Sequence, residues 1–453
     1  MSLHIVILAA GQGTRMRSEL PKVMHRLAGK PLVQHVIDTA ASLSPQGTHL
    51  VYGHKGDMVK AGVHGEHLHW AHQKEQLGTG HALAQALPEI PEDCQVLVLY
   101  GDVPLTSSAT LESFLKLSTG KLGVLTVELD DATGYGRIVR DDQGRVTEIV
   151  EQKDANEQQR RIREINTGIM SMPAAKLNEW LPKLSNSNAQ GEYYLTDVVA
   201  MAVADGTEIV TSGPEFFHEV EGVNNRIQLA ALERAYQRQI AQQLMINGAT
   251  LRDPERIDVR GELSTGQDVE IDVNCIFEGA VSLGDRVTIG ANCIIKNATI
   301  ADDVVIEANS IVEDSVVGRQ ATIGPYARLR PGTELGAKTK IGNFVETKKA
   351  RIGEGSKVNH LSYVGDAVVG QKVNVGAGTI TCNYDGVNKS QTIIGDNVFV
   401  GSNTALVAPI EIAEGATIGA GSTVTKSVDK GQLAIARGKQ RNIDGWQRPV
   451  KKS

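Results

Sequence analysis

The stretch from Phe277 to Val424 carries an aliphatic residue at almost every sixth position, often with a glycine directly after it. A six-residue period fits neither the 3.6-residue period of a helix nor the simple alternation of one long strand. It fits a short strand and a corner, repeated, with each aliphatic side chain facing a central axis. Coils stacked in this way bury one continuous core. The repeat positions are Phe277, Leu283, Ile289, Ile295, Ile300, Ile306, Val312, Val317, Ile323, Leu329, Leu335, Ile341, Ile352, Val358, Val364, Val369, Val375, Ile394, Val400, Leu406, Ile412, Ile418 and Val424.

An ordinary β-sandwich with chance glycine spacing is the alternative, and so many repeats in register count against it. The run resembles the hexapeptide-repeat family of left-handed parallel β-helices. That resemblance implies subunits that trimerise side by side, with acyl-transfer sites between them. The left hand of the coils comes from the resemblance alone, because parallel crossovers in general are right-handed.

Composition narrows the classes of partner. The chain has 453 residues, enough for two or more domains, and a formal net charge of −7, which disfavours nucleic acid and anionic membranes as main partners. Its four cysteines are far apart and form no Cys-x-x-Cys pair, so reduced thiols in a cytoplasmic protein are the simplest interpretation. The first ten residues lack the basic region of a signal peptide, and no apolar stretch is long enough to span a membrane.

The N-terminal half alternates short apolar runs with helix-like segments. This alternation predicts a mostly parallel α/β sheet with helices on both faces, in which ligands gather beyond the carboxyl ends of the strands. The predicted strands are 4–9, 49–52, 95–100 and 122–129, and the predicted helices are 32–41, 80–87 and 110–117.

A glycine loop, Gly11 to Arg15, follows the first predicted strand. It lacks the Gly-Lys-Ser/Thr ending of a P-loop and the third glycine of a dinucleotide fingerprint. What remains is a run of backbone N–H groups near two cations, Arg15 and Lys22, which suits a polyphosphate. The whole string from Leu8 to Lys22 resembles the signature of sugar-1-phosphate nucleotidylyltransferases, which have a Rossmann-like fold. The resemblance implies that Arg15 and Lys22 are catalytic, and that the nucleotide is held by Leu8, Ala9, Ala10 and Gly11.

Asp102 stands at the end of a predicted strand, in Tyr100-Gly101-Asp102. Such a carboxylate can simply cap the next helix, but the resemblance implies a ligand of Mg²⁺. The second implied ligand is Asn224, for which the alternative role is a helix N-cap that Asn225 can fill instead.

Other positions match the same family. Gln73, Gly78 and Thr79 correspond to the segment that reads uracil. The implied contacts to the UDP-sugar are Tyr100, Gly101, Gly136, Glu151 and Asn166. Four histidines, at positions 64, 67, 69 and 72, crowd one stretch, but no ligand pairs follow at finger spacing, and we interpret this stretch as a strand with alternating faces rather than a zinc site.

The segment from Ile227 to Gly248 has apolar residues at three- or four-residue steps and ends in Asn247-Gly248, which predicts an amphipathic helix with a standard stop. The expected organisation is therefore a nucleotidyltransferase domain over 1–226, a linker helix over 227–248 and a β-helix over 249–453.

Two features interrupt the repeats. Residues 345–351 suggest an extra basic corner, and residues 380–392 are too many for a corner and predict an extruded loop. His360 lies between them and should face outward, with Arg330 and Lys348 not far off along the coils. An outward histidine beside a basic pocket is a credible general base.

Together the two halves resemble the bacterial bifunctional family that joins N-acetylglucosamine-1-phosphate uridyltransferase to glucosamine-1-phosphate N-acetyltransferase. The resemblance implies UTP and acetyl-CoA as co-substrates, Mg²⁺, a homotrimer formed through the β-helix, and a product that feeds peptidoglycan and lipopolysaccharide precursors. His360 matches the catalytic base. The matches to glucosamine-1-phosphate contacts are Arg330, Lys348, Tyr363 and Asn374, and those to acetyl-CoA contacts are Ala377, Asn383, Tyr384, Ser402, Ala420 and Arg437.

Two other functions are open on the sequence. The chain can be a nucleotidylyltransferase whose β-helix only regulates or oligomerises it, as in ADP-glucose pyrophosphorylase-like enzymes; turnover of acetyl-CoA discriminates this function from the bifunctional one. It can also be a non-enzymatic subunit that keeps the two-domain architecture for binding partners, as some translation-factor subunits do. The presence of Arg15, Lys22 and Asp102 argues against that function.

Overall fold

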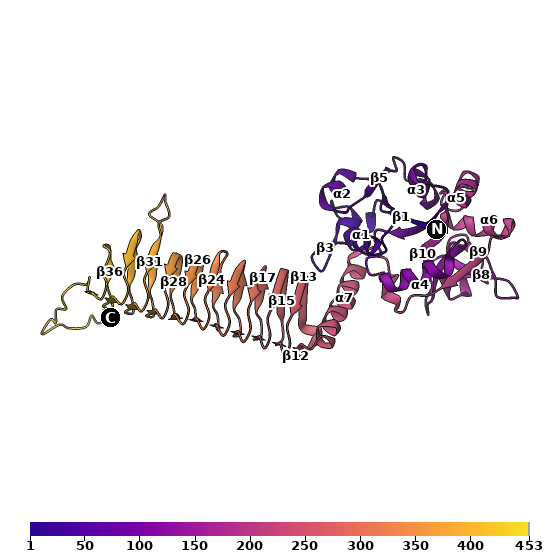
Figure 1. The fold of residues 1–453 in the computed structure, drawn as a ribbon. Helices are drawn as coiled ribbons and strands as arrows, with labels where there is room; N and C mark the ends of the chain where they lie inside the picture. Colours follow the sequence, from indigo (N-terminus) through magenta and orange to yellow (C-terminus); the bar gives the residue numbers. More distant parts are fainter. Residues whose placement is uncertain (452–453) are drawn as a thin grey trace. The chain divides into compact units, whose positions relative to one another are not determined.

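The structure, a computed structural model, describes residues 1–451, so the last two residues of the predicted 249–453 domain lie outside the described ones. The chain divides into two compact units, Met1–Tyr236 and Gln237–Ser453. Figure 1 colours both units along the sequence.

Within the described part of unit 1, nine strands form one sheet. β1 pairs in parallel with both β4 and β6, and β10 runs antiparallel to its neighbours β6 and β7. The prediction of a parallel sheet is confirmed for β1, β4, β5 and β6 and for the pair β7 and β11, with β10 and the hairpin of β8 and β9 as the antiparallel exceptions. In order across the sheet the strands are β11 (Ile209–Ser212), β7 (Leu122–Glu128), β10 (Glu164–Pro173), β6 (Cys94–Tyr100), β1 (Ser2–Leu8), β4 (Gly47–Tyr52) and β5 (Leu68–His72), with β8 (Arg137–Arg140) and β9 (Val146–Val150) as a hairpin beside β10; β2 (Arg26–Leu27) and β3 (Lys30–Pro31) form a separate pair.

Helices cover both faces of this sheet because the buried strands are apolar on both sides. One core includes Val6, Leu8 and Val98 with side chains of α3, α5 and α6, and the other includes Ile5, Ile7 and Leu99 with side chains of α1 and α4. Parallel strands buried on both faces are expected to be continuous runs of Val, Ile and Leu. The helices are α1 (Leu32–Ser42), α2 (Gly56–Gly62), α3 (Thr79–Ala86), α4 (Ser108–Ser118), α5 (Ala174–Trp180) and α6 (Val198–Asp205).

Helix α7 (Arg226–Ile246) confirms the predicted amphipathic helix and ends next to Asn247-Gly248. Its first half contributes Leu232 to a core of unit 1, and its second half contributes Ala241 and Leu244 to the core of unit 2. The division between the units therefore falls inside this helix, and each half is packed as part of a unit.

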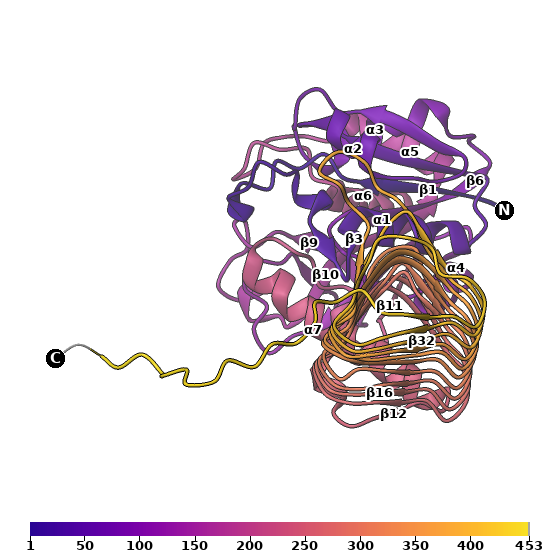
Figure 2. The same cartoon turned by 90° about the vertical axis from the view of Figure 1, so that its left-hand side faces the viewer.

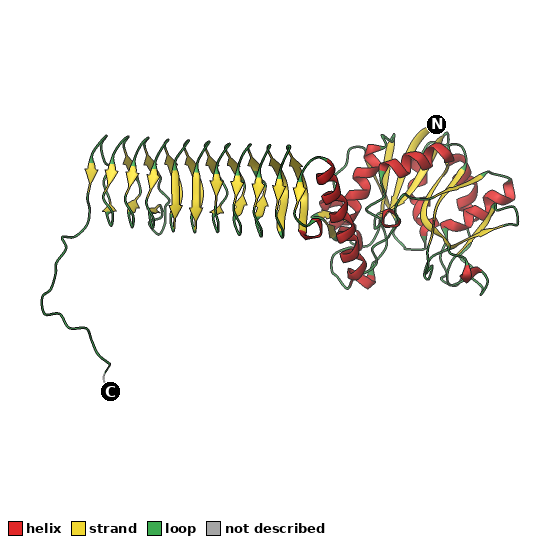
Figure 3. Cartoon of the chain, turned by 90° about the horizontal axis from the view of Figure 1, so that it is seen from below, coloured by secondary structure: helices red, strands yellow, loops and turns green. Residues whose placement is uncertain are grey.

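Unit 2 is a parallel β-helix. Ile276 pairs with Ile294 and Thr288 pairs with Val305, so each coil takes three of the repeats. Figure 2 looks along these coils, and Figure 3 shows their strands stacked in rows. The strands of one row are β12 (Thr250–Leu251), β14 (Glu270–Ile271), β16 (Thr288–Ile289), β19 (Val305–Ile306), β22 (Thr322–Ile323), β25 (Lys340–Asn343), β27 (Lys357–His360), β29 (Asn374–Val375), β32 (Phe399–Val400), β35 (Thr417–Ile418) and β37 (Leu433–Ala434).

The remaining coil strands form two further rows. Long strands such as β15 (Cys275–Leu283) and β26 (Glu346–Ile352) turn a corner and so belong to both rows. They are β13 (Ile257–Thr265), β15 (Cys275–Leu283), β17 (Ile294–Lys296), β18 (Thr299–Ile300), β20 (Ile311–Glu313), β21 (Ser315–Val317), β23 (Arg328–Leu329), β24 (Thr333–Leu335), β26 (Glu346–Ile352), β28 (Tyr363–Val369), β30 (Ile380–Cys382), β31 (Thr392–Ile394), β33 (Ala405–Val407), β34 (Ile410–Ile412) and β36 (Thr423–Val424).

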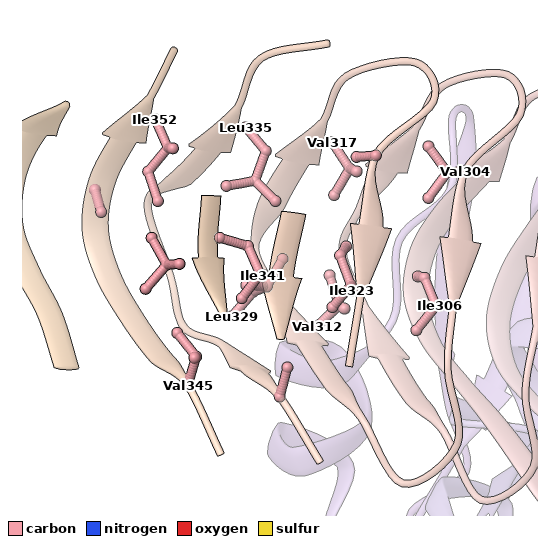
Figure 4. Packing of buried hydrophobic residues seen from close by; sticks show 14 of the residues in the cluster. Val304, Ile306, Val312, Val317, Ile323, Leu329, Leu335, Ile341, Val345 and Ile352 are labelled. Carbon is pink, nitrogen blue, oxygen red and sulfur yellow. The ribbon is translucent and has the colours of Figure 1, made fainter. Parts of the chain in front are cut away.

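The interior of the coils confirms the repeat interpretation. The aliphatic positions are buried along a single core, and Figure 4 shows Ile323 of β22, Leu329 of β23 and Ile341 of β25 facing inward. Small residues four places later are buried too, and a hydroxyl there bonds a nearby carbonyl, as Thr404 Oγ1 does to Gly401 O at 2.6 Å. The buried hydroxyls of Thr339, Thr379, Thr404 and Ser422 are therefore satisfied within the coil.

The predicted loop over 380–392 is confirmed. Val369 pairs with Ile394, and Val375 pairs with Val400. The paired residues are farther apart along the chain here than in the preceding coils. The extra residues therefore form a loop that projects from the coil, beside β31 in Figure 1.

The predicted extra basic corner over 345–351 is wrong. Leu335 pairs with Ile352, and these two residues are as far apart along the chain as the pair Thr288 and Val305. This coil therefore has the ordinary length. None of the described helices combines the length and the apolar character needed to cross a membrane.

Candidate active sites

A pocket of about 570 Å³ opens in unit 1 beyond the carboxyl ends of β1 and β6. This volume lies in the range of small-molecule sites, and the place is where an α/β sheet binds ligands. Ten of the predicted nucleotide residues line it: Leu8, Ala9, Ala10, Gly11, Lys22, Gln73, Gly78, Thr79, Tyr100 and Asp102.

The predicted charged residues meet at the edge of this pocket. Lys22 Nζ forms an ion pair with Asp102 Oδ2 and lies 3.4 Å from Asn224 Oδ1. Arg15 Nη2 donates to the same Asn224 oxygen at 2.8 Å. The side chains of Lys22 and Asp102 are largely buried, so their charges act with little screening by solvent.

Capping does not account for the two predicted metal ligands. Helix α7 is capped by Asn225, whose Oδ1 accepts from the backbone N–H groups of Ile227 and Gln228. Helix α4 is capped by Ser107, whose hydroxyl accepts from Thr110 N–H. Asp102 and Asn224 are therefore left to point their oxygens at the ammonium of Lys22. Two oxygen donors that face the same cation are chemically suitable ligands for Mg²⁺.

The glycine loop can approach Lys22 only because position 13 has no side chain. Gly13 has φ +63°, and a Cβ atom placed on it would lie 2.5 Å from Lys22 Cβ. Gly13 precedes a short 3-10 helix, Thr14–Met16, which carries Arg15. This backbone turn brings both cations to the same side of the loop.

The segment matched to uracil reading is folded around Gln73, which is buried. Gln73 Nε2 donates to Gly78 O at 3.1 Å and contacts His81 Nδ1 at 3.1 Å. Gly78 has φ +116° and precedes the first residue of α3, Thr79. The glutamine and this turn therefore form one wall of the pocket.

The residues matched to the sugar lie around Tyr100. A Cβ atom on Gly136 would lie 3.2 Å from Glu151 Oε1, and Asn166 N donates to Gly136 O at 2.9 Å. Burial raises the pKa of Glu151 above its ordinary value, against a hydrogen bond from Thr196 that lowers it. Burial also raises the pKa of Tyr100, with the charges of Glu151 and Asp102 adding to it. These polar groups thus form one partly buried cluster.

Five further residues, which were not predicted as contacts, line the pocket: Gln12, Val23, Gln76, Ala82 and Glu192. Gln12 and Gln76 lie inside segments already singled out, so a wider window would have included them. Glu192 comes from a distant loop, and its neighbour Tyr193 is held by a backbone bond to Leu77. Nothing local in the sequence distinguishes Glu192.

In unit 2, His360 ends β27 and is exposed, as predicted. Its Nδ1 lies 2.6 Å from Oδ1 of Asn343, which occupies the same position one coil earlier. Because the amide oxygen only accepts, His360 Nδ1 is the donor in this bond, and in the neutral ring Nε2 is then the nitrogen with the lone pair. Asn343 was not predicted as a site residue. Its equivalent position one coil before His360 could have indicated a contact between the two side chains.

The predicted phosphate contacts lie on another face of the coils. Arg330 and Lys348 are on neighbouring coils, and Arg330 Nη1 pairs with Glu346 at 2.7 Å. The pKa of Lys348 is lowered, first by Lys389 from the extruded loop and then by Arg330. Tyr363 starts β28 next to them, and its ring covers Gly365. Within residues 1–451, no hydrogen bond or ion pair joins His360 to these cations.

The predicted acetyl-CoA residues include a row along one corner. Ala377, Ser402 and Ala420 occupy equivalent positions on successive coils, and Arg437 Nη1 donates to Ala420 O at 2.6 Å. Asn374 lies on the same coil as Ala377, at the start of β29.

Asn383 and Tyr384 begin the extruded loop. Asn383 is nearly buried and bonds to Asp366, whereas Tyr384 is 60% exposed. The row and the loop lie on the outside of the coils and leave this site open to its surroundings.

Comparison with known proteins covers both units. Residues 5–162 match the model of the MobA-like NTP transferase domain, residues 259–338 that of the GMPPB C-terminal domain, and residues 391–426 that of the bacterial transferase hexapeptide, six repeats. These matches confirm the predicted fold class, a nucleotidyltransferase domain followed by a β-helix of hexapeptide repeats.

Two relatives extend over the whole chain. The bifunctional protein GlmU of Marinobacter nauticus is 64% identical over 450 residues, with 99% of each chain covered. That of Cellvibrio japonicus is 59% identical over 452 residues, with 100% of each covered. Among solved structures, UDP-glucose pyrophosphorylase complexed with UDP-glucose aligns with 53% of this chain and 100% of its own, at 16% identity and a TM-score of 0.44.

Proposed function

This chain belongs to the family of bifunctional GlmU proteins, and from that premise we propose that it makes UDP-N-acetylglucosamine in two steps at two sites. The β-helix over 249–453 acetylates glucosamine-1-phosphate with acetyl-CoA. The domain over 1–226 then transfers UMP from UTP to N-acetylglucosamine-1-phosphate and releases pyrophosphate. The helix over 227–248 joins the two. The product is a precursor for peptidoglycan and lipopolysaccharide.

In the uridyltransferase step, the phosphate oxygen of N-acetylglucosamine-1-phosphate attacks the α-phosphorus of UTP in line. The loop from Gly11 to Arg15 supplies backbone N–H groups to the triphosphate, and Arg15 and Lys22 neutralise the charge that develops on it. Gln73, Gly78 and Thr79 bind the uracil. Tyr100, Gly101, Gly136, Glu151 and Asn166 bind the sugar. The step needs no covalent enzyme intermediate, so positioning and charge neutralisation are the whole contribution of the protein.

Asp102 and Asn224 are the residues that would hold Mg²⁺, because both present oxygen atoms to one cation position. When bound, this ion supplies positive charge to the phosphate oxygens. Lys22 contacts both oxygens in the structure and can turn to the phosphates once another cation takes over that contact.

In the acetyltransferase step, His360 Nε2 takes a proton from the sugar amine, and the amine nitrogen attacks the thioester carbonyl. The tetrahedral intermediate collapses, the C–S bond breaks, and CoA leaves with a proton. The bond between His360 Nδ1 and Asn343 supports this role because it leaves Nε2 as the basic atom.

The sugar phosphate binds to Arg330 and Lys348, with Tyr363 and Asn374 contacting the sugar. The lowered pKa of Lys348 supports an anion site there, because an incoming phosphate relieves the repulsion among neighbouring cations. Acetyl-CoA lies along Ala377, Ser402 and Ala420, with Asn383 and Tyr384 at the loop and Arg437 near its phosphates.

The protein acts as a homotrimer formed through the β-helix. A column of large apolar side chains, Tyr326, Phe344 and Leu361, is more than half exposed at one corner of successive coils. Each has positive φ, which is unfavourable for such residues, and the rings of Tyr326 and Phe344 stack at 5.4 Å. Exposed apolar columns of this kind support burial against another subunit. The unpaired state of all four cysteines supports a cytoplasmic location.

The observation that carries the proposal is the meeting of Arg15, Lys22, Asp102 and Asn224 in one unit, while His360 is oriented by Asn343 in the other. The test is two assays on the full chain: thiol release from acetyl-CoA with glucosamine-1-phosphate, and Mg²⁺-dependent pyrophosphate release from UTP with N-acetylglucosamine-1-phosphate. Both activities are expected. Pyrophosphate release without thiol release would mean that the β-helix only regulates or oligomerises a nucleotidylyltransferase, and neither activity would indicate a binding subunit.

A further inference from the structure

Three histidines lie side by side on neighbouring strands of the unit 1 sheet. His4 is on β1, His49 on β4 and His69 on β5, and His49 and His69 are direct partners in the parallel register. The ring of His49 stacks on both others, with centroids 5.4 Å from His4 and 4.9 Å from His69. A carboxylate, Glu89, reaches the same place from the short 3-10 helix Leu87–Glu89.

The donor atoms of three of these residues converge. Glu89 Oε2 lies 3.5 Å from His69 Nδ1 and 3.9 Å from His49 Nδ1, and the ligand atoms of the group lie within 4.8 Å of one another. Tetrahedral Zn²⁺, with bonds of about 2.0–2.2 Å, separates its ligand atoms by about 3.4 Å. The two side chains that must move inward, His69 and Glu89, are 48% and 59% exposed and have room to do so.

His49 gives a second and independent indication of a ligand. Its side chain is 1% exposed, and its Nδ1 has no hydrogen-bond partner in the described structure. Its other nitrogen, Nε2, lies 3.1 Å from His4 Nδ1. A proton on His49 Nε2, donated to His4, leaves a lone pair on the buried Nδ1. Metal-binding histidines typically donate their other N–H to a neighbouring acceptor in this way.

The buried Nδ1 of His49 faces the carboxylate of Glu89. The two atoms are 3.9 Å apart, which is beyond hydrogen-bond distance. A buried unpaired nitrogen is costly, and a cation placed between the two groups satisfies both of them.

We propose that His49, His69 and Glu89 form a binding site for a divalent transition-metal ion of the Zn²⁺ type, with water at the fourth position. Two imidazoles and one carboxylate are the donors that zinc prefers, whereas Mg²⁺ prefers oxygen alone. The site is separate from Asp102 and Asn224, and none of its members lines the nucleotide pocket. Of the four crowded histidines between positions 64 and 72, only His69 belongs to it.

The test is equilibrium dialysis of the full chain against ZnCl₂ in excess Mg²⁺, followed by measurement of bound metal. The variant Asp102→Ala serves as a second background, because zinc that replaces Mg²⁺ at Asp102 and Asn224 would be lost in it. We expect one retained equivalent in both wild type and Asp102→Ala. His69→Ala and Glu89→Gln should each weaken binding about tenfold or more, and the matched control His64→Ala, at an exposed histidine outside the group, should not.

Substitution with Co²⁺ gives a second readout. A low-coordinate site of two nitrogens and one oxygen gives visible absorption bands, which should appear in wild type and be lost in Glu89→Gln. Glu89 is exposed, so this variant tests the site even if His69→Ala does not fold. The proposal is overturned if wild type retains no zinc, if Glu89→Gln retains zinc as tightly as wild type, or if Asp102→Ala abolishes retention.

Discussion

The two candidate active sites differ in how completely one chain builds them. In unit 1, strand ends and loops from distant parts of the chain enclose a pocket of about 570 Å³, and Lys22, Asp102 and Asn224 are in contact. In unit 2, His360 lies at the end of one strand row and the predicted phosphate contacts lie on another. One chain lines the candidate pocket of unit 1, whereas the predicted residues of unit 2 lie on an open surface. This difference is what the trimer proposal explains, because a neighbouring subunit can close the open surface.

The two units also differ in how their cores are formed. The unit 1 sheet brings together strands in an order unlike that of the sequence, whereas each coil of unit 2 pairs with the next one along the chain. A stack of this kind is stabilised mainly by contacts between neighbouring coils. Damage to one coil should therefore stay within unit 2 and leave the pocket of unit 1 intact.

The largest expected effect is on uridyl transfer. Lys22→Ala removes the ammonium that contacts both Asp102 and Asn224, so kcat for pyrophosphate release should fall about 10²- to 10³-fold. Thiol release from acetyl-CoA should be unchanged. Steady-state assays of both reactions test this, with Lys116→Ala, an exposed lysine of α4, as the control. An equal loss of both activities would contradict the separation of the two sites.

A core substitution should break unit 2 alone. Ile341 is fully buried in the coils, and Ile341→Ala should lower the free energy of unfolding of unit 2 by about 3 kcal/mol. Denaturant unfolding followed together with pyrophosphate release measures the effect on each unit. Its neighbour Lys340 is exposed, so Lys340→Ala should change stability by less than about 0.5 kcal/mol. If uridyl transfer by Ile341→Ala is lost at the same denaturant concentration at which unit 2 unfolds, the two units do not unfold independently, and the comparison is contradicted.

The orientation of His360 sharpens the comparison within unit 2. Asn343→Ala frees the ring to rotate and to change tautomer, so kcat for acetyl transfer should fall about 10- to 100-fold while uridyl transfer stays constant. Asn343→Asp keeps an acceptor for Nδ1–H and should restore most of the activity. If the aspartate variant is as impaired as the alanine variant, the hydrogen bond does not explain the role of Asn343.

Thiol reactivity gives the smallest effect. Burial raises the pKa of Cys275 to about 12 and that of Cys293 to about 11, so both stay protonated and unreactive up to about pH 9. Cys94 is also buried, which leaves Cys382 as the accessible thiol. Labelling with a disulfide reagent should modify one thiol in the native chain and four after denaturation, and mass spectrometry identifies which. Native labelling of Cys293 would contradict the closed coil core.

The sequence predicted the features that repeat or that lie within one segment. The six-residue period identified the buried positions of unit 2, such as Ile323, and also the extruded loop, because extra residues break the register. The sequence left open whether Asn224 or Asn225 caps the following helix, and the structure shows that Asn225 does.

The features that the sequence did not predict depend on which distant residues the fold brings together. Glu192 reaches the nucleotide pocket from a loop far along the chain. His49 meets Glu89 because β4 lies beside β5 in the sheet and a short helix ends nearby. The residues 345–351 were misread because a basic run inside a coil looks like an insertion, although the coil has its ordinary length.

The central claim is that two independent active sites lie in the two units. The most direct test measures both activities in Asp102→Ala and His360→Ala. The account predicts that Asp102→Ala loses pyrophosphate release and keeps thiol release, and that His360→Ala does the reverse. Loss of both activities in either variant, or full acetyl transfer by His360→Ala, would contradict it.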